Sequence, residues 1–132
     1  MPKELFWLTL TAVLTGVLWL PYILDRIATR GLMGAMANPR PDDAPQSIWA
    51  ARLTAAHGNA VENLVVFAPL VLTAHALGIA SATTAFAAAL YFWARLVHAV
   101  VYTLGVPVLR TLSFAGGFVG QVLFVLAIFG LR

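Results

Sequence analysis

The chain of 132 residues is long enough for one domain, and its composition excludes an ordinary soluble protein. Hydrophobic residues make up 61% and charged residues only 10%, which is too little polar material to cover a surface in water. The net charge of +3 comes mainly from single arginines at the ends of apolar segments, so topology explains it better than a nucleic-acid partner. Because cysteine is absent, disulfides, thiolate metal sites and a cysteine nucleophile are excluded.

Four apolar segments are long enough to cross a bilayer as helices, which takes about 20 residues each. We expect these spans at about 5–24, 49–77, 82–104 and 112–131. A polar segment at about 25–48 joins the first two spans, and the other connections are short. The sequence therefore predicts an all-α, integral membrane four-helix bundle that forms a single domain over residues 1–132.

Arginine and lysine are distributed unequally between the two sides of the predicted membrane. Arg26, Arg30, Arg40 and Arg110 lie on the side of the long first loop, whereas the other side has only Lys3 and Arg132. The positive-inside rule then predicts that the first loop is cytoplasmic and that both termini lie on the far side. High alanine content and short loops favour a bacterial inner membrane.

The second predicted span carries a polar stripe. Ionisable groups inside a span are energetically expensive and usually mark a functional site or its partner. At 100° per residue, one arc of about 100° holds four polar side chains, two of them ionisable: Arg52, Asn59, Glu62 and Asn63. His57 and His75 lie off this stripe, and we interpret both as structural.

The third span carries a second polar face, because Arg95, His98 and Tyr102 are spaced i, i+3 and i+7. Arg110, near the start of the fourth span, is long enough to reach inward. We expect the two faces to turn toward each other, with Glu62 close to Arg95. A purely structural alternative is an ion pair between these two residues, with the asparagines as interhelical hydrogen-bond groups. The histidines lack the spacing of metal ligands, so no metal is expected.

Such a pocket, rich in arginine and walled by apolar residues, suits a small anionic ligand. Guanidinium groups bind carboxylates through two parallel hydrogen bonds. Glutathione fits this chemistry, because it offers two carboxylates to the arginines, one ammonium to Glu62, and amides to the asparagines.

Several motifs in register resemble the MAPEG family (membrane-associated proteins in eicosanoid and glutathione metabolism). The segment AHGNAVENL at 56–64, followed by Phe67, resembles the family's second-helix signature. Ala94-Arg95, His98, Tyr102 and the segment RTLSF at 110–114 resemble its third- and fourth-helix signature. The segment ANP at 37–39 with Asp42 and Asp43 resembles its first loop. The RTLSF segment favours the branch that is similar to microsomal glutathione transferases.

The resemblance implies a homotrimer in which glutathione, as co-substrate, binds between adjacent subunits without a metal. The implied glutathione contacts are Arg30, Asn59, Glu62, Arg95, His98, Tyr102 and Arg110. Arg110 and Tyr102 are the implied catalytic residues, with Arg110 stabilising the thiolate, since a nearby guanidinium lowers the pKa of a thiol. The thiolate would attack a lipophilic small-molecule substrate dissolved in the membrane lipids, in a glutathione transferase or peroxidase reaction of detoxification.

Two other functional classes remain open at the level of sequence. One is a MAPEG-like membrane protein that binds thiols or lipids without catalysis. The other is a small four-helix multidrug exporter, but such an exporter typically relies on an acidic residue in its first span. The predicted first span, at about 5–24, contains no acid, which argues against the exporter.

Overall fold

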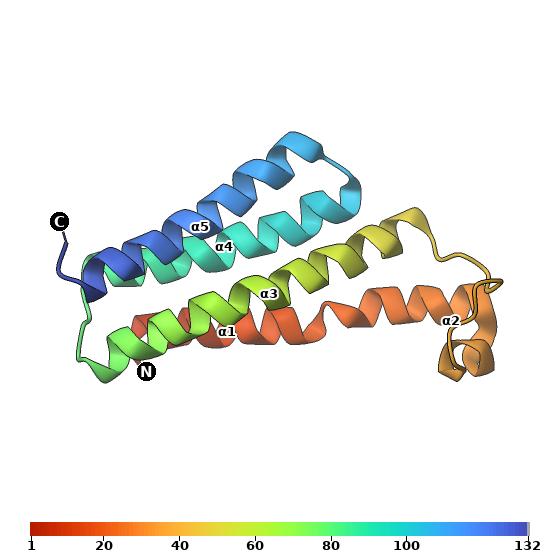
Figure 1. Ribbon diagram of the computed structural model, residues 1–132, viewed down its shortest axis with the longest axis horizontal. Helices are drawn as coiled ribbons and strands as arrows, with labels where there is room; N and C mark the ends of the chain where they lie inside the picture. Colours follow the sequence, from red (N-terminus) through yellow and green to blue (C-terminus); the bar gives the residue numbers. More distant parts are fainter. Residues whose placement is uncertain (132) are drawn as a thin grey trace.

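The computed structural model describes residues 1–131, and these residues form helices joined by short connections (Figure 1). The helices are α1 (Lys3–Val17), α2 (Trp19–Met36), α3 (Ile48–Ala76), α4 (Ala82–Leu104) and α5 (Pro107–Ile128). Four helical segments are long and apolar enough to cross a membrane, with α1 and α2 together forming the first. The predicted all-α membrane bundle is therefore confirmed.

The first helix is much longer than the sequence predicted. Leu18, between α1 and α2, keeps helical backbone angles (φ −62°, ψ −21°), so the helix continues from Lys3 to Met36. The 28 residues from Lys3 to Arg30, before the non-helical Gly31, rise about 42 Å, against about 30 Å of hydrocarbon. The end of α2 consequently extends beyond α4 and α5 in Figure 1, and half of the polar segment expected as a loop at 25–48 is helical.

Gly31 redirects the chain within this extension. Its backbone angles (φ 73°, ψ 166°) are not helical, and a positive φ of this kind favours glycine because it has no Cβ. The remaining turn of α2 after Gly31 therefore runs in a new direction (Figure 1). The segment from Asp25 to Ser47, which comprises the end of α2 and the following loop, is called the extension below.

The other three spans agree closely with the sequence prediction, except at the start of α5. The prediction placed this span at 112–131, whereas α5 begins at Pro107. Proline is favoured in the first turn of a helix, because the missing N–H would have no partner there. Arg110 therefore lies within the first turns of α5 and not in the preceding loop.

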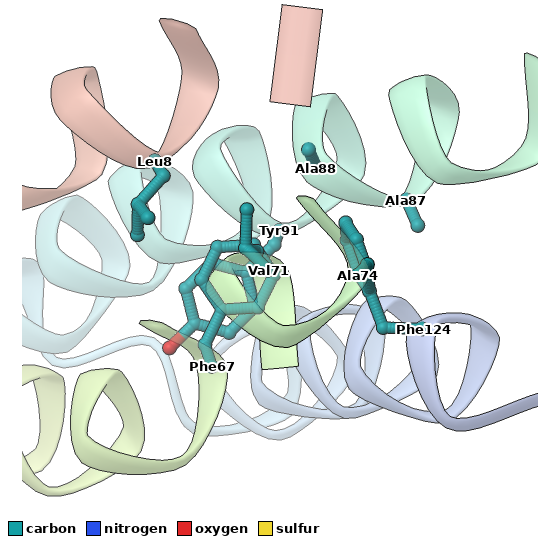
Figure 2. Packing of buried hydrophobic residues seen from close by; sticks show 8 residues of the cluster. All are labelled: Leu8, Phe67, Val71, Ala74, Ala87, Ala88, Tyr91 and Phe124. Atoms are coloured by element: carbon teal, nitrogen blue, oxygen red, sulfur yellow. The ribbon is translucent and has the colours of Figure 1, made fainter. Parts of the chain in front are cut away.

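The apolar core lies where the second half of α3, the first half of α4 and the end of α5 meet (Figure 2). The rings of Phe67 and Tyr91 stack 3.6 Å apart, and Phe124 meets Phe67 edge-on at 5.7 Å. Leu8 of α1 closes the cluster from the other side. Large apolar side chains also cover the outside, including Phe118, as expected where lipid or another subunit forms the surroundings.

Candidate functional site

A cavity of about 270 Å³ opens between α3, α4 and α5, toward the turn that joins α4 to α5. Its lining residues are Asn59, His98, Tyr102, Arg110, Thr111 and Phe114. Four of these were predicted from the sequence as site residues, and three separate helices supply them. The expectation that the polar faces of the second and third spans meet therefore agrees with this part of the structure.

Arg110 lies against Tyr102 at the cavity. The guanidinium Cζ is 4.8 Å from the centroid of the Tyr102 ring, a distance at which a cation is attracted to the ring face. Within residues 1–131, the structure gives Arg110 no carboxylate partner. The guanidinium is thus positioned by the ring and keeps its charge available for an anion.

His98 and Tyr102 pack as a pair beneath Arg110. Their rings are 5.5 Å apart and meet edge to face, and the His98 ring lies 6.3 Å from Phe114. His98 is buried, and its Nδ1 has no hydrogen-bond partner in the described part of the chain. His98 therefore packs against the Tyr102 ring and helps to fix the position of that ring.

Arg95 lies deeper and acts on the cavity through Asn59. Its side chain is 3% exposed, and its Nη2 donates to Asn59 Oδ1 at 2.7 Å. Its Nε and Nη1 are buried and have no partner among residues 1–131. Because Arg95 occupies the amide oxygen of Asn59, the amide nitrogen of Asn59 is the group left to donate a hydrogen bond to a ligand.

The expected proximity of Glu62 and Arg95 is not found within one protomer. Glu62 is exposed, and within residues 1–131 the one ion pair joins Arg30 to Asp43. The polar stripe on α3 is too wide for all of its members to face α4. Asn59, one turn before Glu62, accepts the hydrogen bond from Arg95, while Glu62 lies at the outer edge of the stripe. The predicted pair is therefore wrong for the isolated subunit.

Arg30 also lies away from the cavity. Its Nε donates to the carbonyl oxygen of Ala44 at 2.9 Å, and its Nη1 is 3.6 Å from Asp43 Oδ2. Both contacts hold the loop that follows α2. Arg52, the first member of the predicted stripe, is exposed and lies against Gly105 at the turn after α4.

Two polar residues near the site were missed by the sequence analysis. Thr111 lines the cavity beside Arg110. Gln121 is 8% exposed, and its Nε2 donates to the backbone oxygen of Asn63 at 3.4 Å. A glutamine in an otherwise apolar span was a usable signal, because polar side chains there commonly join helices. His57 lies off the cavity, as predicted, and its Nδ1 is 2.8 Å from the hydroxyl of Tyr22.

These features define a membrane bundle with four spans and a polar, arginine-containing site set between three helices. The chain belongs to the MAPEG family, whose model matches residues 5–130. No curated protein and no solved structure matches it. The protein is accordingly an integral, multi-pass membrane protein, and membership suggests a role in glutathione or eicosanoid metabolism.

Proposed function

We propose that the protein is a glutathione-dependent transferase, similar to microsomal glutathione transferases, that activates the thiol for attack on lipophilic electrophiles, including peroxides. The observation that carries this proposal is the Arg110 guanidinium, which lies over Tyr102 at the cavity and has no carboxylate partner among residues 1–131. A cation held in this way beside apolar walls is suited to a thiolate.

Different residues at the site would contact different groups of glutathione. Asn59 offers its amide nitrogen to a peptide carbonyl or carboxylate, with Arg95 fixing its orientation from below. Tyr102 offers its hydroxyl, and His98 supports its ring. Glu62 does not line this cavity, and it is the acid available for the ligand's ammonium at the exposed face of α3. Arg95 is therefore a positioning residue, whereas Asn59, Tyr102 and Arg110 contact the ligand.

Arg110 favours the thiolate because its positive charge lowers the pKa of the glutathione thiol from about 8.5. The thiolate sulfur then forms a bond to the electrophilic carbon as the leaving group departs with its electron pair. With a peroxide, the sulfur bonds to one peroxide oxygen as the O–O bond breaks, which gives the sulfenic acid of glutathione and an alkoxide that takes a proton to become an alcohol. A second glutathione then displaces water from the sulfenic acid to form glutathione disulfide. Phe114 lines the cavity and is 41% exposed, so an apolar substrate reaches the sulfur from the membrane side.

We further propose that the site is completed in a homotrimer. Glu62 is exposed in the middle of a membrane-spanning helix, and a carboxylate that faces lipid is costly. Arg30 is not among the lining residues of the cavity. A neighbouring subunit would cover Glu62 and supply the partner's Arg30. Native mass spectrometry in mild detergent should show trimers, and a population of monomers and dimers alone would contradict this assembly.

The orientation of the chain is part of the proposal. The arginines around the extension favour a cytoplasmic location for it, in a bacterial inner membrane. Because the chain has no cysteine, the Pro41→Cys variant has a single thiol that can be labelled. It should react with an impermeant maleimide only after the cells are opened, and labelling of intact cells would reverse the topology.

Replacing Arg110 tests the proposed chemistry. Arg110→Ala should lower the turnover of conjugation to a general electrophile by about tenfold or more, which corresponds to about 1.4 kcal/mol. It should also raise the pH at which the rate saturates, because the thiol ionises less readily. Arg40→Ala, a change of an exposed arginine in the loop, is the matched control and should leave turnover unchanged.

Arg30→Ala should separate binding from chemistry. If the partner's Arg30 holds a carboxylate of glutathione, the change should weaken apparent glutathione binding and leave turnover at saturation almost intact. An Arg110→Ala trimer that binds glutathione with unchanged turnover and an unchanged pH profile would show that Arg110 is only a cytoplasmic anchor.

A further inference from the structure

A second cavity, of about 220 Å³, lies at the opposite end of the bundle from Arg110. It forms where α1 begins, α3 ends and α4 begins, the end at which the N-terminus lies in Figure 1. Its lining residues are Pro2, Glu4, Val71, Ala74, His75, Gly78, Ile79 and Ala80. The proposed thiol chemistry uses none of them.

Glu4 is the charged group of this cavity, and it is only partly satisfied. Its side chain is 8% exposed, and its Oε1 accepts a hydrogen bond from Thr84 Oγ1 at 2.6 Å. Among residues 1–131, the structure gives its second oxygen, Oε2, no hydrogen-bond partner and gives Glu4 no ion pair. The neighbouring Lys3 is exposed. Oε2 is not among the fully buried atoms that lack a partner, so this oxygen is accessible and can accept a further hydrogen bond.

The surroundings of Glu4 favour a cation. The cavity adjoins the last turn of α3, which contains His75 and whose C-terminus carries partial negative charge. Glu4 also lies in the first turn of α1, where the partial positive charge of the helix N-terminus stabilises its carboxylate. Within residues 1–131, no three metal-ligating side chains gather at one place, whereas divalent ions prefer several such ligands. A primary ammonium, which carries N–H donors, matches a carboxylate oxygen and needs no such set of ligands.

A larger cavity, whose lining is mostly apolar, adjoins the Glu4 cavity. It has a volume of about 540 Å³ and is lined chiefly by residues from the end of α5 and the start of α4: Ser81, Thr83, Leu123, Leu126, Ala127, Gly130 and Leu131, together with Ile79. Ile79 lines both cavities, so the two are neighbours. A ligand that fills both must be amphiphilic, with a cationic head and an apolar chain.

The position of the two cavities along the bundle agrees with a lipid. The 23 residues of α4 rise about 34 Å, close to the hydrocarbon thickness of about 30 Å. The start of α4 must then lie at one membrane boundary, and Glu4 contacts Thr84 in the first turn of α4. Lipid headgroups lie at this depth.

We propose that Glu4 binds the primary ammonium of an aminophospholipid headgroup, through Oε2, while an acyl chain occupies the apolar cavity along α5. The same ammonium chemistry occurs in free small amines. The adjoining apolar cavity and its place at the membrane boundary favour the lipid. Because the site lies at the other end of the bundle from Arg110, it does not depend on glutathione binding.

The choice between headgroups tests this site on the unaltered protein. Purified protein in mild detergent is titrated with phosphatidylethanolamine, phosphatidylcholine or free ethanolamine, and bound lipid is measured by native mass spectrometry alongside the melting temperature. Phosphatidylethanolamine should be retained and should raise the melting temperature. Phosphatidylcholine, whose quaternary ammonium has no N–H donor, should bind at least about tenfold more weakly. Ethanolamine should compete only at much higher concentration.

A substitution assigns the effect to Glu4. Glu4→Gln should abolish the preference for phosphatidylethanolamine, because the amide loses the charge yet still accepts the Thr84 hydrogen bond. Lys3→Gln, at the exposed neighbouring position, is the control and should keep the preference. Equal binding of the two lipids, or a Glu4→Gln protein with the wild-type preference, would overturn the proposal. Free ethanolamine that matches the lipid in affinity would overturn the lipid assignment. The comparison of lipids on the wild type decides the matter even if Glu4→Gln fails to fold.

Discussion

The extension and the membrane bundle differ in how their charged side chains are paired. In the extension, Asp25 accepts hydrogen bonds from the backbone and side chain of Ser47, and Arg30 pairs with Asp43. In the bundle, within residues 1–131, the charged groups have no ion pair: Lys3, Glu4, Arg52, Glu62, Arg95 and Arg110. The one ion pair among residues 1–131 therefore lies in the extension and not in the bundle.

This difference indicates where the isolated subunit is incomplete. An unpaired charge costs little in water but several kcal/mol in a membrane span or protein interior. Arg110 and Glu4 each line a cavity, and Glu62 lies on an exposed face. A ligand at each cavity and a neighbouring subunit over Glu62 would supply the missing partners.

The largest effect on stability should come from the polar contact inside the bundle. Asn59→Leu keeps the size of the side chain but removes the acceptor of Arg95 Nη2, leaving a buried guanidinium without a partner. We expect a loss of about 1.5–3 kcal/mol in unfolding free energy. Asn63→Leu is the matched control, since Asn63 makes only neutral hydrogen bonds, and should cost less. Thermal unfolding in detergent measures both losses. Equal losses would show that the contact of Arg95 with Asn59 matters no more for stability than the neutral hydrogen bonds of Asn63.

Packing between α4 and α5 should give the next effect. A Cβ on Gly120 would lie 2.9 Å from the carbonyl oxygen of Ala87 and 3.3 Å from Tyr91 Cβ. Gly120→Ala should therefore force the helices apart and cost about 1–3 kcal/mol. Gly16→Ala, where nothing lies within 4 Å of the added Cβ, should be neutral or slightly stabilising. Similar melting temperatures for the two variants would show that this contact is not tight.

The smallest effect should come from the extension. Arg30 and Asp43 are 3.6 Å apart, with side chains 19% and 24% exposed, and solvent screens such pairs. Asp43→Asn should cost less than about 1 kcal/mol, and the cost should fall further in high salt. A loss as large as that of Asn59→Leu would mean that the extension is as dependent on charge pairing as the bundle.

Hydropathy predicted the spans well because the bilayer sets their length. The predicted 82–104 coincides with α4, and 49–77 differs from α3 by one residue at each end. The predicted end of the first helix was wrong, because Asp25 and Arg26 were taken to end the helix as well as the membrane span. Nothing between Asp25 and Arg30 breaks a helix, and contacts with Ser47 and Gln46 hold the extended turns.

The site was predicted in part because helical periodicity specifies which residues share a face. Asn59, His98, Tyr102 and Arg110 meet at one cavity for this reason. Periodicity does not specify which residue on the next helix lies at the same height. Arg95 was therefore predicted to contact Glu62, whereas it contacts Asn59. Glu4 was missed because it precedes the predicted span and contacts Thr84, 80 residues later.

The central claim, that Arg110 activates a bound thiol, is tested most directly by the ultraviolet absorbance of the thiolate. Purified trimer is mixed with glutathione across a pH series, and the absorbance is compared for wild type, Arg110→Ala and the control Arg40→Ala. Wild type and Arg40→Ala should both show thiolate at a pH well below 8.5, the approximate pKa of a free thiol. Arg110→Ala should bind glutathione but show thiolate only near the free value. An Arg110→Ala protein with the wild-type thiolate signal would contradict the account.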